Sequence, residues 1–179
     1  PLRHRSMDRW KKVRQNSLTE EPPASAWDVV DVDKRDEKGR TALLNVAEKG
    51  DDKMVRLLII QRASPDLCAT DGQSPLYLAC RAGSLECARL LLTRQRSVAN
   101  KQANNGFTPL YIAASKGYMP LVQLLLEEKA DVNLNAKDGR SPLHAACESG
   151  HDAIAARLIR AGCKVDQARI NDGSTPLVA

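Results

Sequence analysis

Apolar and polar positions along this chain follow the spacing of short, paired amphipathic helices. In the clearest stretch, Leu110, Ala113 and Ala114 share one face of a first predicted helix. A second predicted helix follows, with Gln123 and Glu127 on its polar side. The apolar stripe of this second helix consists of Leu121, Val122, Leu124 and Leu125. The pattern therefore predicts two short helices that bury their apolar faces.

Two series of glycines show that this helix pair is repeated. The first series recurs at steps of 33, 34, 33 and 34 residues and consists of Gly39, Gly72, Gly106, Gly139 and Gly173. A threonine or serine stands two positions after each of them: Thr41, Ser74, Thr108, Ser141 and Thr175. The second series lies eleven residues beyond the first and consists of Gly50, Gly83, Gly117 and Gly150. Two series in fixed phase predict a repeat protein.

The residues of one unit account for its helix ends. Thr108 is a good N-cap, because its hydroxyl can accept a hydrogen bond from a free amide of the first turn. Pro109 at the first helical position lacks only an amide hydrogen that would have had no partner. Gly117 supplies a left-handed turn before the second helix, and Asp138-Gly139 supplies turn residues that lead into the next unit.

These units resemble ankyrin repeats, whose family pattern runs Asp-Gly-x-Thr-Pro-Leu-His-x-Ala-Ala, then Gly-His, then Leu-Leu, then Gly-Ala-Asp-Val-Asn. Two segments that match its first part are Thr108-Pro109-Leu110-Tyr111 and Ser141-Pro142-Leu143-His144. The resemblance implies an all-α solenoid of stacked helix-turn-helix units with β-hairpin tips. We expect an ankyrin-repeat domain over 24–179, with repeats at about 38–70, 71–104, 105–137 and 138–171 and a partial repeat at 172–179. Residues 1–23 are expected to form a basic tail that can include a short amphipathic helix. The incomplete last repeat suggests a piece of a larger multidomain protein.

The chain departs from the family pattern at the ends of the second helices. The expected glycine is present only as Gly162 and is replaced by Arg62, Gln95 and Lys129. A side chain forced into the left-handed conformation costs about 1 kcal/mol, so we expect these helix ends to be rearranged. Repeats two and four also carry one extra residue before the next glycine of the first series, within 96–105 and 163–172. We therefore expect their hairpin tips to project differently.

Composition narrows the class of protein and its compartment. The chain has 179 residues, of which 42% are apolar and 3% aromatic, and no stretch approaches the roughly 18 apolar residues of a membrane-spanning helix. Its N-terminus also lacks the apolar core of a secretory signal, so we expect a soluble, unsecreted protein. The odd number of cysteines and the lack of CxxC spacing predict reduced thiols in the cytoplasm or nucleus.

The positive charge is concentrated in the N-terminal tail. The formal net charge of the chain is +5, and residues 1–19 contain six basic side chains against Asp8 alone. The remaining chain is neutral, which disfavours nucleic acid as a partner of the repeats. The tail is open to three interpretations: a cap in which Trp10 and Trp27 cover repeat one, a regulated linker, or a segment that binds an acidic membrane or a calmodulin-like partner.

The resemblance also implies where a partner would bind. Ankyrin arrays bind a protein or peptide in a concave groove made of hairpin tips and first helices. The matching positions in this chain are Arg40, Lys49, Gln73, Arg81, Asn104, Phe107, Lys116, Tyr118, Arg140 and Glu148. Five of them form a predicted basic ladder around Phe107: Arg40, Lys49, Arg81, Lys116 and Arg140. This surface suits an acidic partner with an apolar anchor, while the alternative is that the charges only keep the groove solvated.

No residue pattern points to catalysis. The resemblance gives His144 a structural hydrogen bond between hairpin loops, and Cys80 and Cys147 occupy equivalent positions, where we expect buried side chains two repeats apart. The chain shows no zinc-ligand spacing, phosphate-binding loop or nucleophile elbow. The sequence thus predicts a protein-interaction scaffold without a cofactor or metal. The alternative is an adaptor whose basic tail binds an anionic membrane, nucleic acid or a calmodulin-like partner.

Overall fold

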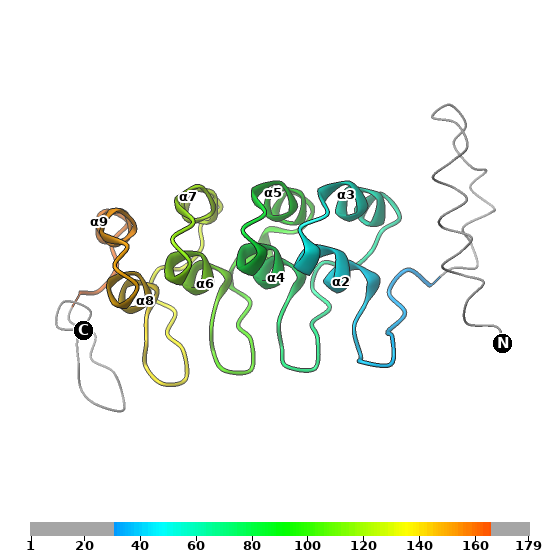
Figure 1. Ribbon diagram of the computed structural model, residues 1–179, viewed down its shortest axis with the longest axis horizontal. Coiled ribbons are helices and arrows are strands. Elements are labelled where there is room, and N and C mark those ends of the chain that lie inside the picture. The colour runs from blue at the N-terminus through cyan, green and yellow to red at the C-terminus, as the bar shows by residue number, and fades with distance from the viewer. Residues whose placement is uncertain (1–30, 166–179) are drawn as a thin grey trace. The chain divides into compact units, whose positions relative to one another are not determined.

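The computed structural model describes residues 31–165, which form two layers of helices (Figure 1). The layer next to the long loops contains the first helix of each repeat: α2 (Ala42–Lys49), α4 (Pro75–Ala82), α6 (Pro109–Ser115) and α8 (Pro142–Glu148). The second helices form the other layer: α3 (Asp52–Ile60), α5 (Leu85–Arg94), α7 (Met119–Glu127) and α9 (Asp152–Arg160). Between residues 31 and 165 the structure contains no strand, and the predicted all-α solenoid is confirmed.

The first helices begin at the predicted N-caps. The hydroxyl of Thr108 accepts a hydrogen bond from the Tyr111 amide at 3.1 Å, and the hydroxyl of Ser74 accepts one from the Tyr77 amide at the same distance. Both cap side chains are buried, so the hydrogen bond also satisfies a hydroxyl that water cannot reach. Gly50 ends α2 with φ at 68°, a left-handed conformation that glycine adopts without steric cost. These local choices explain why each first helix is only two turns long.

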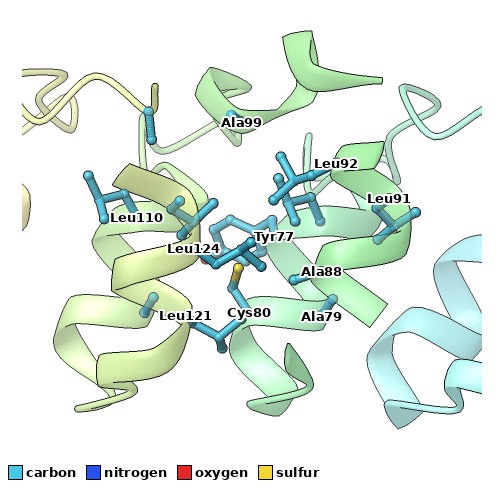
Figure 2. Close-up of a cluster of buried hydrophobic side chains, with 14 of the residues drawn as sticks. Tyr77, Ala79, Cys80, Ala88, Leu91, Leu92, Ala99, Leu110, Leu121 and Leu124 are labelled. Atoms are coloured by element: carbon cyan, nitrogen blue, oxygen red, sulfur yellow. The ribbon is translucent and has the colours of Figure 1, made fainter. Parts of the chain in front are cut away.

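The core lies between the two layers and runs from one repeat to the next. Each first helix contributes the same fully buried leucine: Leu43, Leu76, Leu110 and Leu143. Figure 2 shows Cys80 in a cluster with Tyr77, Leu121 and Leu124, which come from two successive repeats. Because the side chains of one repeat cover those of its neighbour, no single helix pair buries its apolar surface alone.

The expected hairpin tips are turns rather than strands. In repeat three, the Gly106 amide donates to the Ala103 carbonyl at 2.8 Å, and the Ala103 amide donates to the Phe107 carbonyl at 3.0 Å. The other tips close in the same way, at Gly39, Gly72 and Gly139. Successive tips are also joined, because the Asn104 amide donates to the Asp71 carbonyl at 2.9 Å. The tips thus form a continuous row without regular strand pairing.

The ends of the second helices correct one expectation and confirm another. Arg62 and Lys129 adopt the left-handed conformation after all, with φ at 64° and 63°, so these two ends are not rearranged. Gln95 is extended, with φ at −154°, and a 3-10 helix, η2 (Arg96–Asn100), follows it. Only this end is rearranged as expected.

The extra residue of repeat two is accommodated in η2. Val98 and Ala99 of this short helix are buried, so the inserted residue is held against the core. The following tip, from Ala103 to Phe107, then makes the same turn as the others. The expectation that this tip projects differently is therefore wrong. The insertion of repeat four, the fifth partial repeat and the N-terminal tail with its three interpretations fall wholly or partly outside residues 31–165, and the boundary at residue 24 stays a prediction.

Candidate partner-binding face

Two rows of equivalent positions define the surface of the first helices. The first row directly follows the tip glycine and consists of Arg40, Gln73, Phe107 and Arg140. The second row lies eight residues later, at the end of each first helix, and consists of Glu48, Arg81, Ser115 and Glu148. Together with the exposed lysines Lys49 and Lys116, we call these residues the first-helix face. In Figure 1 the face belongs to the layer of α2, α4, α6 and α8.

A carboxylate interrupts the predicted basic ladder in repeats one and two. Arg40 Nη2 lies 2.7 Å from Glu48 Oε2, and the other oxygen of Glu48 pairs with the Arg81 guanidinium. Arg81 Nη1 also donates to Gln73 Oε1 at 2.8 Å. Glu48 thus joins two arginines of the predicted basic ladder. Both arginines already have an anionic partner within the protein.

The arginine of repeat four is neutralised in a similar way. Arg140 Nε donates to Asp138 Oδ2 at 2.7 Å, and Arg140 Nη1 lies 3.6 Å from Glu148 Oε2. Burial raises the pKa of the Asp138 carboxyl, but hydrogen bonds from the Arg140 amide and side chain and the positive charge outweigh it, so this pKa lies below its ordinary value. Three of the five ladder cations are therefore paired within the face.

Phe107 is only partly exposed. Its ring stacks on that of Tyr111, with the centroids 4.1 Å apart and the planes within 4°. The Arg140 guanidinium carbon lies 5.4 Å from the Phe107 centroid, which is within the range of a cation–π contact. Phe107 is half-buried and packs against the core. It therefore presents part of its ring to solvent but is not a free aromatic anchor.

Asn104 and Tyr118 serve the contacts between repeats. Asn104 Nδ2 donates to the Thr70 carbonyl at 3.0 Å, which fixes one tip to the previous tip. The Tyr118 ring lies so close to the turn after α4 that a Cβ added at Gly83 would be 2.9 Å from its Cζ atom. Both side chains were candidates for partner contact, and the structure places them in the stacking of the array.

Lys49 and Lys116 are the ladder cations that remain. Both occupy the position after the second row, both are exposed, and neither forms an ion pair with any residue between 31 and 165. Lys116 lies beside Ser115, the only member of the second row without a charge. The ten predicted residues thus differ in their contacts. Some are charges paired within the protein, some contact the neighbouring repeat, and Lys49 and Lys116 form no ion pair with a residue between 31 and 165.

Comparison with known proteins identifies the family. A family model described as ankyrin repeats, in three copies, matches residues 18–102, 43–136 and 95–169. This chain belongs to the ankyrin-repeat family. Ankyrin repeats are generally protein–protein interaction modules, and the family is typically non-enzymatic.

Three curated proteins are similar to this chain in sequence. The chain is 37% identical over 131 residues to the nuclear factor NF-kappa-B p105 subunit of Gallus gallus, which covers 71% of this chain and 13% of that protein. It is 35% identical over 132 residues to the ankyrin repeat and SOCS box protein 16 of Homo sapiens, covering 69% and 29%. It is 28% identical over 149 residues to the probable E3 ubiquitin-protein ligase XBOS32 of Oryza sativa subsp. japonica, covering 82% and 29%. The chain thus spans less than a third of the length of these relatives.

His144 has a structural position in the ankyrin array, as expected. Its Nδ1 lies 2.9 Å from the Ser141 hydroxyl and 3.2 Å from the Ser141 amide, so side chain and cap bond each other reciprocally. These bonds lie within repeat four, and the bond between hairpin loops that the resemblance implies stays a prediction. The imidazole is fully buried and begins α8.

The five cysteines are free thiols in the ankyrin array. Cys80 is fully buried, and burial raises the pKa of its thiol. Cys147 is half-buried rather than buried, which corrects the expectation for this position. Cys80 is covered by repeat three, whereas the residues that follow repeat four are outside the described range. Within residues 31–165, no group of three His, Cys, Asp or Glu side chains could hold a metal ion, and no helix is long and apolar enough to span a bilayer.

The bridging role of Glu48 is the site feature that sequence reasoning missed. Glu48 and Arg81 are 33 residues apart, which is one repeat, so the repeat phase itself brings them side by side. The same phase places Ser115 between Arg81 and Glu148. The ion pair could have been predicted by comparing the charges at equivalent positions of successive repeats. It does not follow from the sequence of a single repeat.

Proposed function

We propose that this ankyrin array binds a partner protein or peptide through the first-helix face, centred on repeat three. The partner presents an acidic group and an apolar side chain. The observation that carries this proposal is the contrast between repeat three and its neighbours. Repeats one and four have an arginine and a glutamate at the two rows, and these side chains pair, whereas repeat three has Phe107 and Ser115.

The acidic group is supported by the charges around Ser115. Arg81, one repeat earlier, shares the Glu48 carboxylate with Arg40. Lys116 is exposed and has no ion-pair partner in the described part of the chain. A carboxylate of a partner near Ser115 would therefore meet Lys116 without displacing an internal ion pair. Such an exposed charge affects the rate of association more than the binding affinity.

The apolar side chain is supported by half-buried residues of the same repeat. Phe107 and Ile112 both pack against the core and leave part of their surface exposed. At the position of Ile112, the other repeats have Asn45, Leu78 and Ala145, of which the last two are buried. An apolar group of a partner can thus extend the Phe107–Tyr111 stack outward without any rearrangement of the array.

Charge reversal tests this proposal. Peptides selected from a displayed random library against the intact chain should be acidic and should contain an apolar residue. Lys116→Glu should slow their association at least tenfold, since it replaces attraction by repulsion. Ser115→Glu should act in the same direction because it supplies the missing carboxylate internally. Gln123→Glu on the exposed side of α7 is the matched control; equal reductions of the association rate for Gln123→Glu and Lys116→Glu would contradict the assignment of the face.

We also propose that the module has no catalytic role of its own and acts in a larger protein of the cytoplasm or nucleus. In the described range, the buried polar side chains are Thr41, Ser74, Thr108, Ser141 and His144, and each of them caps a first helix. The greater length of the relatives supports a role within a larger protein. The buried thiol of Cys80 supports a location in the cytoplasm or nucleus. The alternative function of the basic tail concerns residues outside the described range and stays a prediction, which deletion of 1–19 tests.

A further inference from the structure

The second helices present a regular exposed stripe on the layer opposite the first-helix face. Each of them exposes residues at relative positions i, i+3 and i+7, which lie on one side of a helix. The four stripes are Lys53, Arg56 and Ile60; Glu86, Arg89 and Thr93; Pro120, Gln123 and Glu127; Ala153, Ala156 and Arg160. Because the stripes occupy equivalent positions, differences between them are differences in chemistry and not in placement.

Ile60 is the exception among these stripes. It is 67% exposed, and the equivalent positions hold Thr93, Glu127 and Arg160. Ile159 is the other large apolar side chain that is exposed between residues 31 and 165, at 43%, but it occupies the position at which Leu92 is buried. Ile60 alone projects from an outward stripe.

Cationic residues stand near Ile60 along the chain and at the end of the neighbouring helix. Arg56 lies one turn before Ile60 on α3, Arg62 follows the end of the same helix, and Arg94 ends the adjacent α5 (Figure 1). None of these three forms an ion pair within the described residues, and Arg89 has only a loose pair with Glu86 at 3.7 Å. We call this group the outer corner: Lys53, Arg56, Ile60, Arg62, Arg89 and Arg94. The acidic residues nearest to the outer corner lie at its Lys53 end: Asp51 caps α3, Asp52 begins it, and Glu86 occupies the position equivalent to Lys53 on α5.

Arg62 is held in the corner at a conformational cost. Its φ is 64°, whereas the equivalent position in repeat four is Gly162, with φ at 86°. A residue with a Cβ atom is disfavoured in this region, so a glycine would satisfy the fold better. Lys129 has the same conformation in repeat three, so this position accepts a cationic side chain at that cost. The guanidinium of Arg62 adds a positive charge near Ile60.

We propose that the outer corner binds the surface of an anionic phospholipid membrane. Guanidinium groups pair with phosphate oxygens in a planar, two-point geometry, and an exposed isoleucine among cations is the pattern of residues that insert at the lipid interface. A protein interface of this kind would have a core depleted of charge, and a site for single-stranded nucleic acid would have aromatic rings for stacking. The outer corner is rich in charge and contains no aromatic residue. This function is independent of the first-helix face, which remains accessible on the other layer.

Sedimentation of the full chain with lipid vesicles tests the proposal. The chain should bind vesicles of phosphatidylserine and phosphatidylcholine and should not bind vesicles of phosphatidylcholine alone. Arg62→Gly should lower the partition coefficient about fivefold, as expected for one cation at an anionic surface. Its thermal stability should be unchanged or higher, since glycine relieves the left-handed strain, so lost binding cannot be ascribed to unfolding. Ile60→Gln should lower binding further.

Lys129→Gly is the matched control, because it removes one cation from the same left-handed position beside Glu127 and Glu128. It should change vesicle binding by less than about twofold. Equal losses for Arg62→Gly and Lys129→Gly would overturn the proposal, and so would binding that disappears on deletion of 1–19 but not on Arg62→Gly. If Arg62→Gly weakened binding to polyglutamate or to DNA as much as to vesicles, the corner would be a general polyanion site and the lipid assignment would be wrong.

Discussion

At the scale of single residues, Phe107 connects the stability of the array with its proposed function. Its ring packs between Tyr111 of its own repeat and Arg140 of the next. Sequence reasoning placed Phe107 on the first-helix face, because its position after the tip glycine follows from the repeat phase. Its half-burial could not be predicted, because that depends on two neighbours that are four and 33 residues away.

Truncation of Phe107 should therefore destabilise the protein. We expect Phe107→Ala to lower the free energy of unfolding by about 1–3 kcal/mol, since it removes a half-buried ring and an aromatic stack. Lys116→Ala, at an exposed site, should change it by less than about 0.5 kcal/mol. Urea unfolding measures both variants. A Phe107→Ala variant as stable as Lys116→Ala would show that the stack is not a packing contact.

The carboxyl group of Asp138 should make the stability of the protein depend on pH. The pKa of this carboxyl is lowered in the folded state from the ordinary value of 3.8, so ionised Asp138 contributes stability above that value. This contribution is lost as the pH falls through the lowered pKa. Asp138→Asn removes the titration, so its stability should depend less on pH below about 4 than that of the unchanged chain. Urea midpoints across this range measure the difference, and parallel pH profiles would contradict the role of Arg140.

At the scale of helices, starts could be predicted and ends only in part. The caps at Thr41, Ser74, Thr108 and Ser141 depend on local hydrogen bonds, so the sequence identifies them. The ends at Arg62, Gln95 and Lys129 depend on packing between repeats. At Gln95 the burial of Val98 and Ala99 in η2 favours the extended backbone. No local sequence pattern predicts this conformation.

Glycine substitution distinguishes these helix ends. Lys129→Gly should raise the free energy of unfolding by up to about 1 kcal/mol, because Lys129 has φ at 63°. Gln95→Gly should give no such gain, because Gln95 is extended and glycine adds only freedom to the unfolded chain. Thermal unfolding of the two variants is the measurement. A gain for Gln95→Gly and a loss for Lys129→Gly would mean that the two backbone conformations are assigned the wrong way round.

At the scale of the whole array, the described repeats use one buried framework and two different surfaces. The buried leucines and caps are the same in every repeat, which is why the family and the fold could be predicted from the sequence. The surfaces differ between repeats, and their meaning depends on contacts across one repeat, such as the pair of Glu48 and Arg81. The ion pairs of three candidate arginines with carboxylates of the protein were not predicted, and the role of the ten candidate residues in binding stays a prediction.

Hydrogen–deuterium exchange with and without a bound peptide tests the central claim most directly. A peptide from the proposed selection should slow amide exchange in the segment from Ala103 to Lys116, which includes the tip of repeat three and α6. Exchange in α3 and α5, which carry the outer corner, should stay the same. Protection confined to the second helices, with α6 unchanged, would contradict a partner-binding face on the first helices.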